Sequence, residues 1–392
     1  MRVAFYISLA AAIALCAQDS EELTREGPFY VRTMGATVIA RVPGRIPPQL
    51  RVISRGNVVL RGSKGDQIVY KFVQRAKARS DADAKRLFRP VLITAVPMMT
   101  MTTLTVIPSA GDLVSNDLEV QVPRGVAISF VQAQDGTVEA YDLDGSVQMV
   151  AWYGIRGDRV RGNVEGRTGG GEIRLGKVGG SVDCISGGGS IFIDNVGGSA
   201  KCKTAGGEIV VREAGGPLLL TNVSGNIEVD HAASTVEAHT GEGLIEVNQA
   251  GGEVIADTRG GSIQIGSARG ARCESAAGAI RVKNASGPLN VQTAMGSILA
   301  ELIAGSRLED SLLAASSGDV TVLIPSRLSL SVMARNDSGA NPRIQSDFSE
   351  VPVRSFGFSH PPTLAEGQIN GGGPVLRINV ASGIIYLRKL KQ

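Results

Sequence analysis

The sequence holds few side chains of the types that carry acid–base or metal chemistry. Its three histidines, His231, His239 and His360, include no pair with metal-ligand spacing, and no Cys-x-x-Cys occurs. No Ser-His-Asp arrangement can be proposed from so few histidines. His239 is expected to face solvent. The sequence therefore predicts no catalytic, cofactor-binding or metal-binding residue, and it leaves the ligand-binding residues unknown.

Carboxylates are more frequent but scattered. Glu228 and Glu246 stand one repeat apart, so they should stack on neighbouring strands. We favour the interpretation of this pair as exposed like charges over its interpretation as a catalytic dyad. A calcium-binding β-roll would need an aspartate at every turn. The corresponding positions are Arg167, Ile185, Lys203, Thr221, His239 and Asp257. Calcium is therefore not expected.

Three cysteines, Cys184, Cys202 and Cys273, recur at one position of the repeat. Cys184 and Cys202 should lie on adjacent coils, close enough in Cα distance for a disulfide. Stacking in register need not supply the torsion that a disulfide requires. Buried thiols that act as small apolar residues are favoured, and the disulfide stays open as the alternative.

The framework that carries these residues is a ladder of isoleucines, each preceded two positions earlier by glycine. The isoleucines are spaced by 18 residues, once by 17, and are Ile173, Ile191, Ile209, Ile227, Ile245, Ile263, Ile280 and Ile298. The glycines are Gly171, Gly189, Gly207, Gly225, Gly243, Gly261, Gly278 and Gly296. A fixed period near this length is the signature of a solenoid of stacked coils.

Each coil is predicted to hold two short strands. Val182 and Cys184 alternate with polar neighbours, as do Ile191 and Ile193, and glycines break the chain between them. A second buried ladder should be Val164, Val182, Ala200, Leu218, Val236, Val254, Ala271 and Leu289. A polar ladder ends the first strand: Thr168, Ser186, Thr204, Asn222, Thr240, Thr258, Ser275 and Thr293. Corner hydrogen bonding is favoured for it over a flat ice-, sugar- or mineral-binding stripe.

Composition agrees with such a fold. Hydrophobic residues make up 43% of the chain, and its 50 glycines are explained by several turn glycines per coil. A net charge of +3 is too small to indicate nucleic acid as a partner. A basic run comprises Arg75, Lys77, Arg79, Lys85, Arg86 and Arg89. A solvated face is favoured for this run over contact with anionic envelope polymers.

The chain is expected to divide into four parts. Residues 1–17 predict a signal peptide, because Arg2 precedes the apolar run Val3–Leu15 and polar residues follow. Lipidation of Cys16 is disfavoured by Leu15 but left open. Residues 18–124 predict an N-terminal β cap, residues 125–325 the solenoid with regular coils over 162–304, and residues 326–392 a C-terminal β cap. No transmembrane segment is expected in the mature chain.

Outside the regular coils the sequence predicts mostly strands. The expected strands are Phe29–Val31, Ala36–Val42, Leu50–Ile53, Asn57–Leu60, Ile68–Val73, Leu104–Ile107, Leu118–Val122, Leu328–Ala334, Val375–Val380 and Ile384–Leu390. One helix is expected at Asp81–Phe88, capped by Ser80 and stopped by Pro90. A surface loop is expected near Asp347–Gln368.

Two short segments each allow a structural interpretation and a binding interpretation. Trp152 and Tyr153 are expected to seal one end of the core, with ligand stacking as the alternative. Arg156-Gly157-Asp158 spells an integrin-binding tripeptide, and a plain turn is favoured over adhesion through it.

The layout resembles a known bacterial family. A strand Leu118-Glu-Val-Gln-Val-Pro-Arg-Gly125 is followed by coils of the form Gly-x-Val-x-Ala-x-Thr-x-x-Gly-x-Ile-x-Val, and the chain closes with Val380-Ala-Ser-Gly-Ile-Ile-Tyr-Leu. Over most of residues 27–390 this pattern is similar to the bacterial "putative adhesin" domain of unknown function, a relative of head GIN domain proteins. The resemblance implies an envelope-associated β-solenoid and brings no catalytic residues.

Together these features predict an all-β, parallel β-solenoid that is exported and not an enzyme. It would act at the cell envelope, in the periplasm, at the outer envelope or outside the cell, as an adhesin-like binding or scaffolding protein without cofactors. Its partner would be an envelope polysaccharide or another surface protein. The alternatives are a polysaccharide-active β-helix enzyme and a self-assembling structural protein.

Overall fold

The computed structural model describes residues 22–38, 49–88, 90–97, 101–108, 114–303, 308–338, 343–355 and 362–390. The predicted signal peptide, Cys16, Arg89 and His360 lie outside these residues, as does part of the expected strand Ala36–Val42. The chain divides into two compact units, residues 1–167 and residues 168–392. The four-part division expected from the periodicity remains a prediction.

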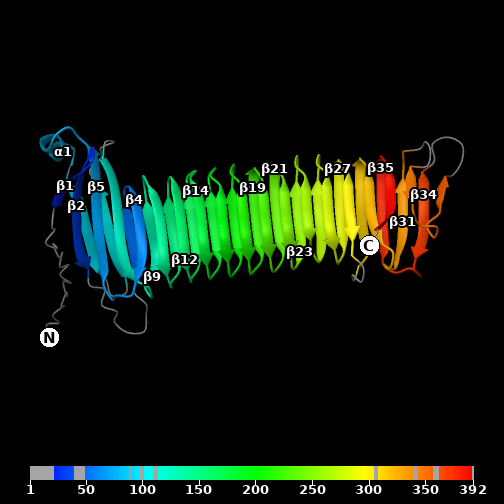
Figure 1. Ribbon diagram of the computed structural model, residues 1–392, viewed down its shortest axis with the longest axis horizontal. Coiled ribbons are helices and arrows are strands. Elements are labelled where there is room, and N and C mark those ends of the chain that lie inside the picture. The colour runs from blue at the N-terminus through cyan, green and yellow to red at the C-terminus, as the bar shows by residue number, and fades with distance from the viewer. Residues whose placement is uncertain are drawn as a thin grey trace, which may run out of the picture. The chain divides into compact units, whose positions relative to one another are not determined.

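In residues 168–392 the coils stack as predicted, each giving one strand to each of two sheets (Figure 1, green to yellow). One sheet contains β14 (Glu172–Val178), β16 (Ile191–Val196), β18 (Ile209–Ala214), β20 (Ile227–Ala232), β22 (Ile245–Ala250), β24 (Ile263–Ser267), β26 (Ile280–Ala285), β28 (Ile298–Leu302), β30 (Val320–Pro325), β32 (Ile344–Ser346) and β36 (Ile385–Leu390). The other contains β15 (Val182–Ser186), β17 (Ala200–Thr204), β19 (Leu218–Ser224), β21 (Val236–Glu242), β23 (Glu253–Thr258), β25 (Gly270–Ser275), β27 (Leu289–Met295), β29 (Ser311–Ser317), β31 (Leu330–Asn336), β33 (Val353–Ser355), β34 (Thr363–Ile369) and β35 (Val375–Ser382).

The repeat residues pair in parallel, like above like. Ile191 pairs with Ile209, and Ile209 pairs with Ile227. Every isoleucine of the ladder is at most 1% exposed. The branched side chains therefore interlock between the two sheets, and the predicted all-β solenoid is confirmed. Among the described residues, no helix has the length and apolar character needed to cross a membrane.

Close backbone approach explains the regular spacing of glycine before each isoleucine. Gly225, Gly243 and Gly296 have φ values of 151°, 142° and 153°, a region that suits glycine. Elsewhere space is the constraint, because a Cβ on Gly261 would lie 1.7 Å from the carbonyl oxygen of Gly243 on the preceding coil. Both requirements come from coils stacked at strand spacing.

The C-terminal strands enter the stack out of sequence order. β35 lies between β29 and β31, and β36 lies between β30 and β32, all in parallel. In Figure 1 the red strands accordingly lie between yellow and orange ones. The surface loop expected near Asp347–Gln368 is wrong in part, because β33 and β34 form there and pair antiparallel. β34 also pairs antiparallel with β31, so β33 lies beyond β34 in this sheet.

Residues 1–167 combine antiparallel and parallel strands. The unit contains β1 (Glu22–Glu26), β2 (Phe29–Val38), β3 (Gln49–Ser54), β4 (Asn57–Ser63), β5 (Ile68–Lys77), β6 (Val91–Pro97), β7 (Met101–Pro108), β8 (Val114–Pro123), β9 (Ala127–Ala133), β10 (Thr137–Leu143), β11 (Val147–Ala151), β12 (Gly154–Val160) and the start of β13 (Val164–Thr168). β1, β2, β5 and β8 pair antiparallel. β4 lies in parallel between β8 and β10, and β3 between β7 and β9. Coil-like stacking therefore begins within the region expected to be a cap.

The predicted helix is confirmed as α1 (Asp81–Leu87). Ser80 caps it, with its hydroxyl oxygen accepting a hydrogen bond from the Asp83 amide at 3.2 Å. Ala84 and Phe88 pack with Tyr30 and Ala76 in one buried cluster. The helix therefore covers the face of the antiparallel strands β2 and β5.

Candidate functional site

The two histidines that the structure describes lie on different sheets. His231 on β20 lies 3.2 Å from the Gln249 side-chain oxygen. His239 on β21 has Nε2 at 2.9 Å from Glu237 and Nδ1 at 4.0 Å from Asp257, with about a third of its side chain exposed. Within the described part of the chain, no three His, Cys, Asp or Glu side chains are grouped to hold a metal ion.

The predicted neighbours Glu228 and Glu246 are brought together. They pair directly across β20 and β22 on the outward, half-exposed face of the sheet. Ile227 and Ile245, which precede them, are fully buried. The glutamates therefore lie on an open sheet face, where water screens the repulsion between two carboxylates.

The cysteines are buried thiols, as the sequence favoured, and the disulfide alternative is wrong. Cys184 and Cys202 pair in register on β15 and β17 without forming a disulfide, and Cys273 occupies the same inward position on β25. Burial raises the pKa of the Cys202 thiol to about 12, and it raises that of Cys273 as much. The Cys202 and Cys273 thiols are therefore protonated at neutral pH, and all three buried cysteines serve as core residues.

The polar ladder is structural. Its members are at most 9% exposed, so they cannot form a surface stripe. The Thr204 hydroxyl donates to the carbonyl oxygen of Gly189 at 2.8 Å, and the Thr293 hydroxyl donates to that of Gly278 at 3.0 Å. The favoured prediction of corner hydrogen bonding is thereby confirmed, and the ice-, sugar- or mineral-binding stripe is excluded for these residues.

Two predictions about the segment after β11 are wrong. Trp152 and Tyr153 are 60% and 63% exposed, so they do not seal the core. They lie in the short bend between β11 and β12, where the side chains point away from the inward ladders. Arg156-Gly157-Asp158 lies within strand β12 and forms no turn.

Ion pairs hold both charged ends of this tripeptide to the sheet. Arg156 lies 3.9 Å from Glu139 on the neighbouring strand, and Asp158 is paired with Arg159. Arg159 also donates to Asp142 at 2.7 Å, which holds the pKa of that carboxyl below its usual range. A tripeptide fixed in a sheet is not presented as an adhesion loop would be.

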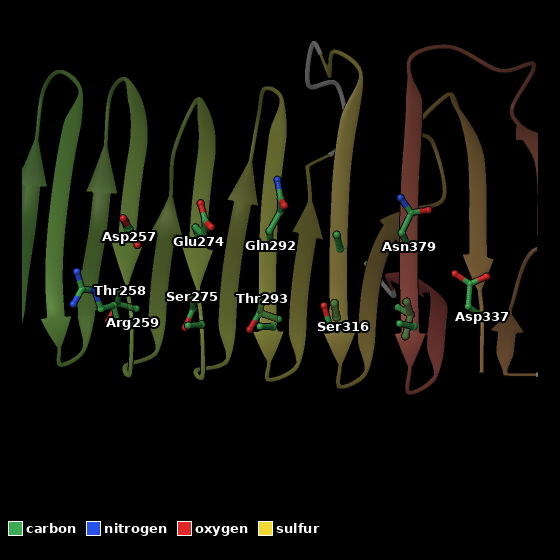
Figure 2. A pocket seen from close by; sticks show the side chains of 16 residues that line it. Asp257, Thr258, Arg259, Glu274, Ser275, Gln292, Thr293, Ser316, Asp337 and Asn379 are labelled. Atoms are coloured by element: carbon green, nitrogen blue, oxygen red, sulfur yellow. The ribbon is translucent and has the colours of Figure 1, made fainter. Parts of the chain in front are cut away.

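Residues 168–392 carry a groove of about 490 Å³. It runs across β23, β25, β27, β29, β35 and β31 (Figure 2). Asp257, Glu274 and Gln292 form one in-register row on its wall, and Asn379 continues this row on β35. Parallel pairing sets Asp257, Glu274 and Gln292 at about 4.8 Å intervals. Ala314 on β29 occupies the place between Gln292 and Asn379, so the wall presents three adjacent polar side chains and a fourth two strands further on.

Small residues form the floor of this groove. Ala276, Ala294 and Ala381, together with Ser316, occupy the corner position that follows the buried polar ladder. Earlier coils also carry small residues at this position, namely Gly169, Gly187, Ala205 and Gly241, whereas Val223 and Arg259 are larger. Small corner residues therefore leave room for the groove but do not by themselves decide where it lies.

The charge of the groove is negative on balance. Its described lining includes the carboxylates of Asp257, Glu274 and Asp337 and the guanidinium of Arg259 (Figure 2). Asp337 pairs with Arg335 at 2.8 Å, and the Gln292 amide donates to Asn290 at 2.9 Å. Among the described residues, none hydrogen-bonds to the exposed side chains of Glu274 or Asn379. These two side chains are available to a ligand.

The sequence reasoning missed this groove. The small corner residues Ala276 and Ala294 stand one period apart, but they are a weak signal of the floor, because four earlier coils carry equally small residues there. Ala381 and Asn379 carry no such signal, because β35 joins the sheet from the far end of the chain.

The comparisons with known proteins leave the family open. No protein-family model and no curated protein sequence matches the chain. The chain is similar to the crystal structure described as a putative cell adhesion protein from Clostridium sporogenes, with 8% sequence identity, a TM-score of 0.20, and coverage of 91% of this chain and 100% of that one. So distant a likeness assigns no function, and membership of the "putative adhesin" family remains a prediction.

Proposed function

We propose that the protein is an exported, non-enzymatic binding or scaffolding protein of the cell envelope that holds an extended neutral polysaccharide in the groove of residues 168–392. The observation that carries this proposal is the row of Asp257, Glu274 and Gln292 on three adjacent strands, which Asn379 continues beyond Ala314. A linear polysaccharide presents hydroxyl groups at regular intervals along its length. A row fixed by parallel strands can meet several of them at once.

The charges of the groove favour a neutral glycan over an anionic one. Three carboxylates face one guanidinium in its described lining, so a polyanion would be repelled. Carboxylate and amide oxygens accept hydrogen bonds from sugar hydroxyls, and the amide groups of Gln292 and Asn379 also donate. The wall lies on strands packed by fully buried side chains, so little ordering of the protein is needed on binding.

The scattered placement of ionisable side chains among the described residues supports a binding role over catalysis. The outward pair Glu228 and Glu246 lies on the opposite sheet from the groove and does not line it. The groove carboxylates Asp257 and Glu274 lie on an open wall where water has free access. Such a site suits reversible hydrogen bonding.

The proposal is tested by calorimetric titration of the full chain with soluble cello-oligosaccharides and chito-oligosaccharides. Saturable binding is expected for at least one of them, with Glu274→Ala/Gln292→Ala weakening it by at least about tenfold, since two hydrogen-bonding groups are lost. Glu228→Ala/Glu246→Ala is the matched control on the other sheet and should bind normally. Release of shortened oligosaccharides, or equal weakening by both double variants, would refute the proposal.

A further inference from the structure

A second concave surface lies in residues 1–167, beside α1. It is a hollow of about 810 Å³ whose described lining includes Arg25 from β1, Lys77 from the end of β5, Arg79, and Arg86 from α1. Asp83 is the single carboxylate among the described lining residues. Four positive charges thus face one negative charge around a space large enough for several small chemical groups.

The positive charges of this hollow are not neutralised by the protein. In the part of the chain that the structure describes, no ion pair joins Arg25, Lys77, Arg79 or Arg86 to a carboxylate. Asp83 accepts a hydrogen bond from the Ser80 hydroxyl at 2.9 Å, as part of the helix cap. By contrast, Arg75 of the same basic run is paired with Asp117. The hollow therefore concentrates the unpaired part of that run.

Arg25 is also held in place. Its guanidinium lies 5.5 Å from the centroid of the buried Tyr30 ring, and its Nε donates to the Gly27 carbonyl at 3.4 Å. A positioned guanidinium loses less side-chain freedom when it binds an oxyanion. Pro28, Ala78 and Leu87 complete the lining and give the hollow an apolar base.

We propose that this hollow binds the phosphate groups of a linear anionic polymer. Arginine forks and a lysine ammonium match phosphate oxygens, and a phosphate group can accept hydrogen bonds from several of these side chains together. The volume exceeds what one phosphate fills, so consecutive phosphates of one chain can enter. The concave form admits a polymer strand better than the flat surface of a bilayer. This site is independent of the groove in residues 168–392, which has the opposite charge.

The experiment titrates the full chain with long-chain inorganic polyphosphate at low salt. Saturable binding that weakens as salt is added is expected, because these exposed charges are screened. Arg79→Gln/Arg86→Gln should weaken binding by at least about tenfold, which corresponds to 1.4 kcal/mol. Both side chains are exposed, so the variant should fold normally. Its circular dichroism spectrum checks this.

A charge-matched control distinguishes the hollow from general attraction. Arg156→Gln/Arg161→Gln removes two exposed arginines of the same unit that are paired with Glu139 and Asp144 and do not line the hollow, so polyphosphate affinity should stay within about twofold. Failure to bind polyphosphate, or equal weakening in both variants, overturns the proposal. Tighter binding to polygalacturonate or to phosphatidylglycerol vesicles than to polyphosphate overturns the assignment to a phosphate polymer. Neutral oligosaccharide binding should be unchanged by Arg79→Gln/Arg86→Gln.

Discussion

The buried polar ladder gives a sharp stability prediction at Thr204. Its side chain is fully buried and donates a 2.8 Å hydrogen bond to the Gly189 carbonyl of the preceding coil. Thr204→Val keeps the side-chain volume but leaves that part-buried carbonyl without its donor, at a cost of about 1–3 kcal/mol. Thr204→Ser keeps the donor and loses one methyl group, at a cost of about 0.8 kcal/mol. Serine already occupies the equivalent positions 186 and 275.

Urea unfolding of the full chain, followed by circular dichroism, measures both changes in the free energy of unfolding. Hydrogen exchange shows whether the loss is local, because a solenoid is stabilised mainly by contacts between adjacent coils. The outward neighbour Lys203→Ala should change stability by less than about 0.5 kcal/mol. If Thr204→Val were no more destabilising than Thr204→Ser, the corner hydrogen bond would not stabilise the fold and the reasoning would be wrong.

Three further predictions test the core, the thiols and the exposed aromatic residues. Ile227→Ala should lower the free energy of unfolding, measured in urea, by about 2–5 kcal/mol because it empties a fully buried position. Glu228→Ala on the outward face should lower it by less than about 0.5 kcal/mol, and similar losses in the two variants would contradict the stacked core. Burial raises the pKa of Cys202 from 9.0 to about 12, so the contribution of this thiol to stability is complete below pH 9 and should fall by about 1.4 kcal/mol per pH unit as the pH rises from 9 towards 12. Cys202→Ala should remove that share of the pH dependence of unfolding. An unchanged pH dependence in this variant would contradict the prediction. Fluorescence of Trp152, the single tryptophan of the sequence, should be quenched readily by iodide in the native protein, and protection from iodide would instead place the indole in a core.

The local repeat made much of this fold predictable. The alternation around Val182 and Ile191, repeated every 18 residues, indicates two strands per coil whose inward residues must stack. The structure places those residues in register, with Ile191 opposite Ile209 and Cys184 opposite Cys202. The helix cap at Ser80 was predictable for the same reason, since a short polar side chain and the residues that follow it decide the local hydrogen bonding.

The candidate sites were harder to predict because they join side chains that are distant in the chain. The groove needs Glu274 and Asn379 on one sheet, and the hollow needs Arg25 beside Arg86. The basic run indicated part of the hollow, but no pattern in the sequence relates Arg25 on β1 to the end of α1. Trp152 was misplaced because apolar character favours burial, while the bend between β11 and β12 leaves no core for it to enter.

The sequence alone determined what each coil is: two short strands, an inward isoleucine ladder, and corners where glycine permits close backbone approach. These features depend on residues within one period, so periodicity reveals them. Only the tertiary structure decided which coils are neighbours at the ends of the repeat, where β35 enters between β29 and β31 and β3 enters between β7 and β9. The physical reason is that any strand with a suitable apolar face can complete a parallel sheet edge. The strand with which it pairs depends on the path of the connecting segment, and a local sequence pattern does not encode that path.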